Sequence, residues 1–381
     1  MSSKPNLCIL NTSLSSGGAE KVISLLLKKL VNDFKVTLVL FYNDIHFQIP
    51  EAVETVLLSE EKPPKSWRKR IVNFYDFYKK YNALIKRERI DYSISFLAFP
   101  NFINALASSN NPGIKTIISE RGYPSDNTSS KTSAYISKVF YPILYNKCDK
   151  LFSNSVHINE DLNKNFGVKI PLEVIYNPVE EPLRKIASDD LLNTNSSFSI
   201  INVGSVNIRK NQQMIIKAVA KLNHHSHLNI LGDGDLINEL KKLSSDLNVS
   251  SKVAFEGKVS NVNSYLCKSH CFVLSSFTEG FPNALLEALA VGLPCISTNC
   301  LSGPLEMLND NEPVFIEEGE FHKAKYGILI NNNDIQGLVN ALKYLEENEM
   351  ERVHYSQLAI ERSKEYFTEN IYQKFYKFII N

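Results

Sequence analysis

The order of apolar and polar residues predicts an α/β chain of two doubly wound lobes that face a central cleft. Short apolar runs alternate with longer amphipathic segments along most of the sequence, which is typical of parallel strands joined by helices. The alternation is interrupted once, by a polar stretch over 183–197, and then begins again. A length of 381 residues also favours two domains over one. We therefore expect an N-terminal lobe at 1–182 and a second lobe at 183–365.

The composition is that of an ordinary globular protein, with 44% hydrophobic and 22% charged residues. A formal net charge of +1 argues against a dedicated nucleic-acid binder. The sequence has no apolar run of the roughly eighteen residues that a transmembrane helix requires. The apolar run at 7–10 is too short for the core of a signal peptide, so we expect a cytoplasmic protein.

The cysteines lie mostly in or beside apolar runs. In a reducing compartment such cysteines are usually small buried side chains. Cys267, His270 and Cys271 are close in sequence, but no second ligand pair stands at zinc-site spacing. We therefore expect no metal site. The six positions are Cys8, Cys148, Cys267, Cys271, Cys295 and Cys300.

The first lobe contains apolar runs that predict strands and polar loops that follow them. Gly17-Gly18 stands between the first strand and a helix at 19–30, where glycine lets the backbone approach a ligand closely; a tight turn is the equal alternative. The fourth run ends in Ser119-Glu120-Arg121, and ligands bind at the carboxyl ends of parallel strands. The expected strands are 7–10, 36–41, 92–97, 115–119, 150–154 and 172–177.

Residues 62–90 differ from the rest of the chain in charge. They hold ten Lys or Arg residues and only two acidic residues, among aromatic residues at helical spacing that include Phe74, Tyr75, Tyr78 and Tyr81. A basic, aromatic helix is typical of a segment that binds an anionic membrane surface. The alternative is a solvated face over an aromatic stripe in the core. We favour the membrane surface because the charge asymmetry and the aromatic residues coincide.

Two loops of the second lobe gather residues that suit a nucleotide-sugar. Arg209 and Lys210 follow its first strand, and Glu279 follows its fourth. A helix that begins near Pro282 or Asn283 would direct unpaired N–H groups at the same place, which is a ready anion site. Glu279 could bind hydroxyls of a sugar, and Glu287 could accept hydrogen bonds from a ribose. The expected strands are 198–203, 228–231, 253–255, 271–274, 294–298 and 327–330.

Each carboxylate alone is more often a helix-dipole partner or a solvated charge than a ligand group. Their combination with fixed cations is less easily explained in that way. The chain has no P-loop, no dinucleotide fingerprint after its first strand and no nucleophile elbow. These absences disfavour the commonest nucleotide-binding and hydrolase motifs.

The E-x7-E element from Glu279 to Glu287, within EGFPNALLEALAVGLPCIST, resembles the retaining, two-lobed (GT-B) glycosyltransferases of family 4. Ser119-Glu120-Arg121 and the segment from Cys300 to Glu306 are similar to the branch that builds bacterial surface glycans. That branch includes enzymes acting on polyprenyl-diphosphate-linked sugars. The resemblance covers nearly the whole chain and includes Gly17-Gly18-Ala19-Glu20, Ile175 to Val179, Val203-Gly204 with Lys210-Asn211, Gly232-Asp233-Gly234 and Gly257.

The resemblance implies two Rossmann-like lobes and retaining transfer from a UDP-sugar, a hexose or an N-acetylhexosamine, without a metal or another cofactor. Lys210 and Arg209 would neutralise the departing diphosphate, Glu279 would contact the transferred sugar and Glu287 the ribose. Glu120 would take part in catalysis and Arg121 in acceptor binding. The remaining donor-binding positions would be Gly17, Gly18, Ser205, Gly257, Lys258, Val259, Gly280, Phe281, Asn283, Ala284 and Leu285.

One position departs from the family pattern. An Arg usually follows the glycine matched by Gly204, and here the residue is Ser205. Arg209 is the candidate for the missing charge. A His that often stands in the first lobe is also not evident, and Glu120 or Arg121 is expected in that region.

We expect a membrane-associated enzyme that extends a lipid-linked glycan or a surface polysaccharide such as capsule or lipopolysaccharide. It would lie on the cytoplasmic face of the plasma membrane, with residues 366–381 forming a helix that returns to the first lobe. Two alternatives stay open: a nucleotide-sugar epimerase of the same fold, and an inactive subunit that only binds a sugar nucleotide.

Overall fold

The computed structural model of the protein describes the chain except for residues 1–3, 63, 65, 127–130, 193–196 and 223–224. The chain forms two compact units. Unit 1 comprises Met1–Pro178 with Thr368–Asn381, and unit 2 comprises Val179–Phe367. The sequence placed the boundaries after residues 182 and 365. At the observed boundary Val179 pairs with Phe367, and Val179 N donates to Tyr366 O at 2.9 Å, so both connections belong to unit 2.

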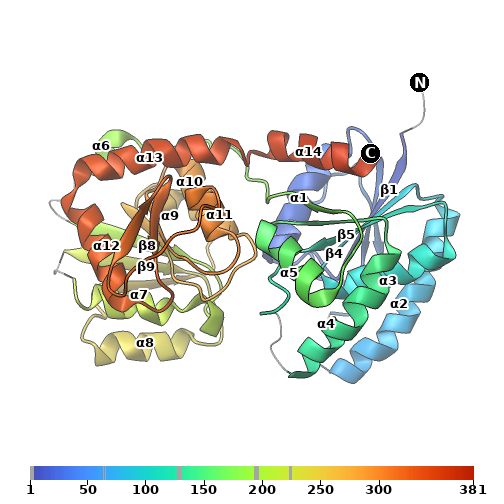
Figure 1. The fold of residues 1–381 in the computed structure, drawn as a ribbon, viewed down its shortest axis with the longest axis horizontal. Helices are drawn as coiled ribbons and strands as arrows, with labels where there is room; N and C mark the ends of the chain where they lie inside the picture. The colour runs from blue at the N-terminus through green and yellow to red at the C-terminus, as the bar shows by residue number, and fades with distance from the viewer. Residues whose placement is uncertain (1–3, 63, 65, 127–130, 193–196, 223–224) are drawn as a thin grey trace. The chain divides into compact units, whose positions relative to one another are not determined.

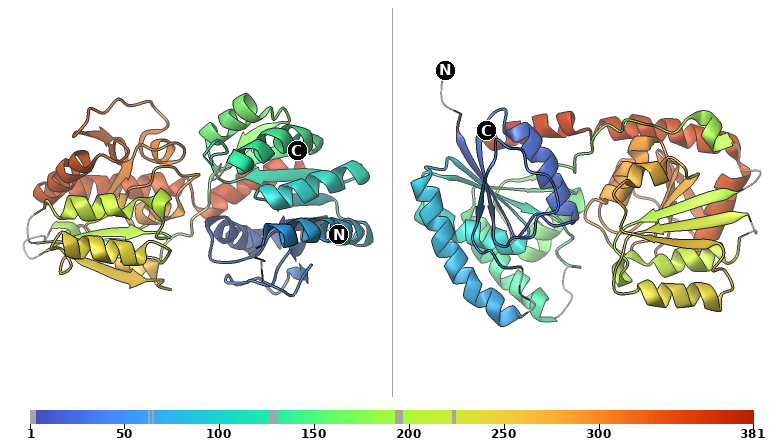
Figure 2. Two further views of the ribbon diagram at one scale, coloured as in Figure 1. Left: turned by 90° about the horizontal axis from the view of Figure 1, so that it is seen from below. Right: turned by 180° about the vertical axis from the view of Figure 1, so that it is seen from behind.

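Unit 1 is built on a parallel sheet with the order β3-β2-β1-β4-β5-β6-β7. Four helices, α2 to α5, cover one face of this sheet, and α1 and α14 cover the other (Figures 1 and 2). The strands are β1 (Asn6–Asn11), β2 (Lys35–Leu40), β3 (Glu54–Leu57), β4 (Tyr92–Phe96), β5 (Lys115–Glu120), β6 (Lys150–Ser153) and β7 (Leu172–Val174). The helices are α1 (Gly18–Leu30), α2 (Trp67–Arg87), α3 (Ala98–Asn110), α4 (Lys131–Leu144), α5 (Val156–Phe166) and α14 (Thr368–Ile380).

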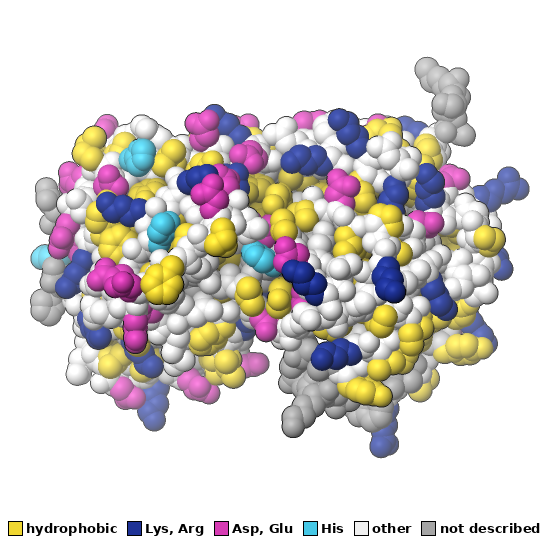
Figure 3. Space-filling model, in the orientation of Figure 1, with side chains coloured by type: hydrophobic (Ala, Val, Ile, Leu, Met, Phe, Trp, Pro, Cys, Tyr) yellow, Lys and Arg dark blue, Asp and Glu magenta, His cyan; other side chains and the backbone are white. Residues whose placement is uncertain are grey.

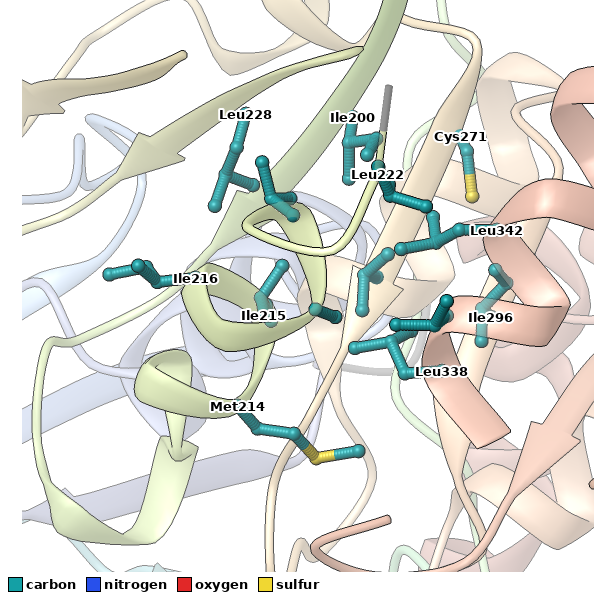
Figure 4. Close-up of a cluster of buried hydrophobic side chains, with 14 of the residues drawn as sticks. Ile200, Met214, Ile215, Ile216, Leu222, Leu228, Cys271, Ile296, Leu338 and Leu342 are labelled. Carbon is teal, nitrogen blue, oxygen red and sulfur yellow. The ribbon is translucent and has the colours of Figure 1, made fainter. Parts of the chain in front are cut away.

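Unit 2 has a sheet with the order β10-β9-β8-β11-β12-β14-β13, in which only the edge strand β13 is antiparallel. Its core lies where α7 and α12 pack against the sheet, with Ile200, Ile215 and Leu338 among the buried side chains (Figure 4). The strands are β8 (Phe198–Val203), β9 (Ser226–Leu231), β10 (Val253–Gly257), β11 (Cys271–Leu274), β12 (Cys295–Thr298), β13 (Phe321–Ala324) and β14 (Gly327–Ile330). The helices are α6 (Ser188–Leu192), α7 (Gln212–Val219), α8 (Ile237–Asp246), α9 (Val262–Leu266), α10 (Asn283–Val291), α11 (Pro304–Asn309), α12 (Ile335–Glu347) and α13 (Glu349–Lys364).

Both units are therefore doubly wound α/β folds, as the sequence predicts. The prediction missed two edge strands, β3 and β13. Both are only partly buried, so they lack the continuous apolar run that marks a buried parallel strand. Among the described residues no helix is both long enough and apolar enough to span a bilayer.

The basic segment at 62–90 forms α2, and its aromatic side chains divide between two surfaces. Phe77 and Tyr81 are buried in the core of unit 1, and Phe74 packs against them. Tyr75 is 61% exposed, with Lys79 Nζ 4.4 Å from the centre of its ring. The core stripe that we weighed as the alternative is thus real. The described residues on the outer face of α2 are mainly basic, with Val72, Tyr75 and Asp76 exposed among them and Asp76 paired with Lys80 at 2.8 Å.

Candidate functional site

A charged cluster lies at the carboxyl edge of the unit 2 sheet. After β8 the chain forms a single turn of 3₁₀ helix, Ile208–Lys210, in which Asn207 Oδ1 accepts a hydrogen bond from Lys210 N at 3.1 Å. Lys210 Nζ lies 2.6 Å from Glu279 Oε1, and Arg209 Nη1 lies 3.8 Å from Glu279 Oε2. The structure therefore brings together the two cations and the carboxylate that the sequence assigned to two separate loops.

Glu279 is ionised in this cluster. Its side chain is 5% exposed, and burial by itself raises the pKa of a carboxyl group. The charges of Lys210 and Arg209, with hydrogen bonds from Lys210 and Ser276, outweigh burial and hold the pKa of Glu279 below its usual range. A buried ionised carboxylate accepts hydrogen bonds, so it suits hydroxyl groups better than it suits proton donation.

The loop that carries Glu279 is fixed by the last residue of β12 and by the segment that follows this strand. Thr298 Oγ1 donates to Ser276 O at 2.6 Å, and Glu279 N donates to Leu301 O at 3.2 Å. Ser302 Oγ lies 2.6 Å from Glu279 O and 2.8 Å from Gly280 O. The sequence reasoning gave Thr298 and Ser302 no role. The signal that could have found Ser302 was its place in the Cys300 to Glu306 element of the resemblance.

Gly303 is required for the close packing of this segment against the Glu279 loop. Its φ is +92°, which favours glycine, and a Cβ there would lie 2.7 Å from Pro282 Cδ and 3.0 Å from Gly280 O. The segment 302–303 therefore presses directly on the loop before α10. Pro282 is the N-cap residue with extended backbone, and Asn283 is the first residue of α10. Of the two starting points that the sequence allowed, the structure selects Asn283.

The predicted donor-binding residues at α10 differ in the groups that they can present to a ligand. Gly280, Phe281 and Leu285 are buried, and the ring of Phe281 packs 5.4 Å from that of Tyr366. Only the backbone of these positions can serve a ligand. Ala284 and Glu287 are half-buried, so the Glu287 carboxylate retains access to solvent.

Backbone hydrogen bonds join the loops after β8, β9 and β10, and glycines make these bonds possible. Gly204 N donates to Leu231 O at 2.9 Å, and Gly232 N donates to Gly257 O at 2.7 Å. A Cβ at Gly232 would lie 2.0 Å from Gly204 O, so no larger residue fits there. The Lys210 side chain passes over Gly204, with Cε 3.6 Å from the position of a Cβ.

Ser205, Lys258 and Val259 lie in these joined loops, and the first two are exposed. The position that departs from the family pattern, Ser205, therefore places no charge near Glu279. Arg209 does place one there, at the distance given above.

In unit 1, Gly17 is the N-cap of α1 and Gly18 its first residue. The Glu20 carboxylate folds back over this turn, with Oε2 only 2.2 Å from where a Cβ of Gly17 would stand. A Cβ at Gly17 would displace only the far end of this flexible side chain, so the turn itself does not require glycine.

Glu120 and Arg121 lie at the end of β5, also in unit 1. Glu120 is 2% exposed and accepts a hydrogen bond from Tyr145 Oη at 2.9 Å; burial raises the pKa of Glu120 above its usual range. Arg121 donates to Asn177 Oδ1, and its Cζ lies 5.8 Å from the ring centre of Phe96 and 5.9 Å from that of Phe152. Burial lowers the pKa of Arg121 to about 9.

No metal site is found in the part of the chain that the structure describes, where no group of three or more His, Cys, Asp or Glu could hold an ion. Cys267 and Cys271 are buried free thiols. His270 Nδ1 accepts a hydrogen bond from Ser199 N at 2.9 Å, which gives this side chain a structural partner.

Comparison with known proteins relates both halves of the chain to glycosyltransferases. Residues 184–362 match the family described as glycosyl transferases group 1, and residues 16–181 match Glycosyltransferase Family 4. A Campylobacter jejuni protein named N-acetylgalactosamine-N,N'-diacetylbacillosaminyl-diphospho-undecaprenol 4-alpha-N-acetylgalactosaminyltransferase is 30% identical over 355 residues, which are 92% of this chain and 93% of the relative. A second C. jejuni protein, a GalNAc-alpha-(1->4)-GalNAc-alpha-(1->3)-diNAcBac-PP-undecaprenol alpha-1,4-N-acetyl-D-galactosaminyltransferase, is 27% identical over 96% of each chain.

Solved structures share the fold at lower identity. The crystal structure of Anabaena HepE in complex with UDP and glucose has a TM-score of 0.77 at 17% identity, covering 98% of this chain and 99% of HepE. The lipopolysaccharide outer core galactosyltransferase WaaB has a TM-score of 0.72 at 17% identity, covering 98% of both chains. The fold, both family matches and the C. jejuni relatives agree, and the chain belongs to the GT-B glycosyltransferases, with a family 4 domain followed by a group 1 domain.

Proposed function

We propose that this glycosyltransferase moves a hexose or an N-acetylhexosamine from a UDP-sugar to a lipid-linked or surface-polysaccharide acceptor, with retention of anomeric configuration. The observation that carries the proposal is the cluster of Lys210 and Arg209 around the buried Glu279, beside the N-terminus of α10. The names of the C. jejuni relatives, which specify undecaprenyl-diphosphate acceptors and α linkages, support the acceptor class and retention. The HepE complex with UDP supports the donor class.

The donor diphosphate would bind against Lys210, Arg209 and the backbone N–H groups at the start of α10. Fixed cations and a helix N-terminus stabilise the negative charge that develops on a leaving diphosphate. Glu279 would accept hydrogen bonds from hydroxyls of the transferred sugar, and Glu287 from the ribose. The backbone at Gly257 to Val259 would hold the base, and Gly17 and Gly18 would contact the diphosphate.

Transfer would proceed by attack of the acceptor hydroxyl from the side of the leaving group. The bond from the anomeric carbon to the UDP oxygen breaks, the bond to the acceptor oxygen forms, and the acceptor proton passes to a phosphate oxygen of the donor. No protein base is required, in keeping with an ionised Glu279 that already has cationic partners. Glu120 and Arg121 would act on the acceptor side, and no metal or other cofactor would be needed.

The enzyme would work at the cytoplasmic face of the plasma membrane, with residues 62–90 on the anionic surface. The exposed basic residues of α2 support this location, since each basic residue near an anionic leaflet contributes about 1 kcal/mol to binding. A lipid-linked acceptor would then meet an enzyme that is already at the membrane.

The test is to incubate the purified full chain with a panel of UDP-sugars and polyprenyl-diphosphate-linked acceptors, and to assign the new linkage by NMR. We expect an α-linked product, and we expect Lys210→Ala and Glu279→Ala each to lower kcat/KM by roughly 10²–10³-fold, as loss of a group that stabilises transition-state charge does. Lys242→Ala, on the exposed surface of α8, is the matched control and should leave the rate unchanged.

Absence of transfer by the wild type with every donor and acceptor would overturn the proposal. So would full activity of the double variant Lys210→Ala with Glu279→Ala. Interconversion of the UDP-sugar without an acceptor would instead identify an epimerase.

A further inference from the structure

The outer side of α4 in unit 1 is apolar and exposed. Tyr135 is 71% exposed, Ile136 42%, Phe140 43% and Ile143 54%. Residues 136, 140 and 143 follow the i, i+4, i+7 spacing that places side chains on one face of a helix. Isolated exposed apolar side chains are ordinary on protein surfaces, but four on one short helix form a contiguous patch, and such patches mark interaction sites.

The opposite side of the same helix is apolar as well. Tyr141 and Leu144 are buried and pack with Leu162 and Phe166 of α5 in the core of unit 1. A helix that is apolar on both sides is normally buried on both sides. In the described part of the chain the outer side of α4 has no such cover, apart from the ring of Phe102, 6.1 Å from that of Phe140.

The charges around this patch indicate what covers it. Between Lys131 and Leu144 the sequence has no Asp or Glu, and Lys138 is exposed. In the same helical layer α2 exposes Arg68, Lys69 and Lys79. Figure 3 shows hydrophobic and basic side chains next to one another over this part of unit 1.

A second copy of the chain is a poor partner for this surface. A two-fold interface centred on α4 would bring the exposed Lys138 of both copies together, with no acidic residue between Lys131 and Leu144 to pair with it, and like charges at an interface are unfavourable. An anionic bilayer offers negative headgroups for the lysines and arginines, together with an apolar layer for the ring and aliphatic side chains.

We propose that α4 is a lipid-contact helix, in which Tyr135, Ile136, Phe140 and Ile143 enter the interfacial layer of an anionic bilayer. The helix would lie along the surface while α2 rests on the headgroups. The purpose of this contact, access to a lipid-linked acceptor, rests on the proposed function, but vesicle binding itself requires neither donor nor transfer.

The first experiment is flotation of the full chain with vesicles of phosphatidylcholine and phosphatidylglycerol. Tyr135→Ser with Ile143→Ser should lower partitioning about a hundredfold, at roughly tenfold for each apolar side chain that no longer leaves water. This loss should persist in high salt, because apolar burial is not screened. Phe315→Ser with Met350→Ser is the matched control, since these side chains of unit 2 are 88% and 73% exposed. Equal partitioning of the α4 variant and the control variant would overturn the proposal.

The second experiment places a fluorophore in the contact. All six native cysteines are buried, so Ile143→Cys offers one accessible thiol, and Phe315→Cys supplies the control label. Brominated acyl chains should quench the label at 143 and leave the label at 315 bright. Equal quenching of the two labels would contradict insertion. A dimer that Tyr135→Ser with Ile143→Ser dissociates, with vesicle binding unchanged, would assign the patch to a second copy and also overturn the proposal.

Transfer to a short, water-soluble diphosphate acceptor separates this inference from the proposed function. The Tyr135→Ser with Ile143→Ser variant should keep its activity on that acceptor and lose activity on the long-chain acceptor in vesicles. Lys210→Ala should lose both. Vesicle binding through α4 by a chain that transfers no sugar would refute the proposed function and leave the lipid-contact helix standing.

Discussion

Single residues fix the direction of the backbone at the carboxyl edge of the unit 2 sheet. Ser302 holds the carbonyl oxygens of Glu279 and Gly280, and its own φ of +59° is unusual for a residue with a side chain. Gly303 follows with a φ of +92° and contacts Pro282. Because these two carbonyl groups are held toward Ser302, the neighbouring N–H groups of the loop point in other directions. We infer that this turn positions the loop that carries Glu279.

Three glycine substitutions separate steric contact from backbone strain. Gly303→Ala introduces both a steric contact and backbone strain, because its Cβ would contact Pro282 and Gly280 and its φ is positive. Gly257→Ala introduces backbone strain without a steric contact, since φ is +67° and no atom lies within 4 Å of the Cβ position. We expect Gly257→Ala to destabilise unit 2 by roughly 1–2 kcal/mol and Gly303→Ala by about 1–3 kcal/mol more.

Gly113→Ala is the control for this series, because its Cβ would meet no atom within 4 Å and its φ is not in the left-handed region. It should change the stability of unit 1 by less than about 1 kcal/mol. Hydrogen exchange, read separately for the unit that holds each glycine, measures these differences. Equal losses for Gly303→Ala and Gly257→Ala would show that the contact with Pro282 is unimportant.

At the scale of elements, α2 and α4 belong to the same helical layer but expose different kinds of side chain. α2 exposes basic residues, and its aromatic side chains mostly pack inward, with Phe77 and Tyr81 buried. The outer side of α4 is apolar and the sequence from Lys131 to Leu144 has no acidic residue. Binding through α2 should therefore depend on salt, and binding through α4 should not.

Neutralising Arg68, Lys69 and Arg70 together tests the contribution of α2. At low salt the triple alanine variant should bind anionic vesicles roughly 10²-fold more weakly, at about 1 kcal/mol for each basic residue near the leaflet. The difference should shrink as salt increases. Alanine at Lys242, Lys268 and Lys343, which are exposed in unit 2, removes the same charge elsewhere. Co-sedimentation that is the same for both variants at low salt would exclude a role of α2.

The sequence predicted elements well where burial left a strong pattern. β1 and β11, in the middle of the two sheets, are nearly continuous apolar runs, and the E-x7-E segment marked the Glu279 loop and α10. It failed at the edges, where β3 and β13 are half exposed and carry mixed residues. It also missed the contacts of Thr298 and Ser302 with the Glu279 loop, because a hydrogen bond between two distant loops leaves no local periodicity. The exposure of the outer face of α4 could not be predicted either, because an apolar residue in a helix does not reveal which side of the helix is covered.

At the scale of the whole molecule, the two ends of the chain build one unit. The C-terminal helix α14 packs on unit 1 through Phe375, which is fully buried with its ring 5.2 Å from that of Phe152. Lys29 Nζ pairs with Glu369 at 2.7 Å, and Lys150 Nζ donates to Phe378 O at 2.9 Å. Unit 2, by contrast, is continuous in sequence from Val179 to Phe367.

A substitution near the C-terminus should therefore destabilise the N-terminal unit. Phe375→Ala should cost unit 1 about 3–5 kcal/mol, because it leaves a cavity in a packed core. The exposed neighbour Lys374→Ala should change stability by less than about 0.5 kcal/mol. Hydrogen exchange of β6 against that of β8 would localise the loss. A greater loss in β8 than in β6 would contradict the assignment of α14 to unit 1.

This arrangement also sets an order of events during synthesis. Domains of a growing chain generally fold from the N-terminus as they leave the ribosome. Here the sheet of unit 1 is made before unit 2, whereas Thr368–Asn381 is made after unit 2, so Phe152 has no α14 beside it until all of unit 2 has been synthesised. Unit 1 is therefore completed only after the whole of unit 2 has been made. A nascent chain that stalls before Phe375 would thus carry a family 4 domain without the helix that covers Phe152.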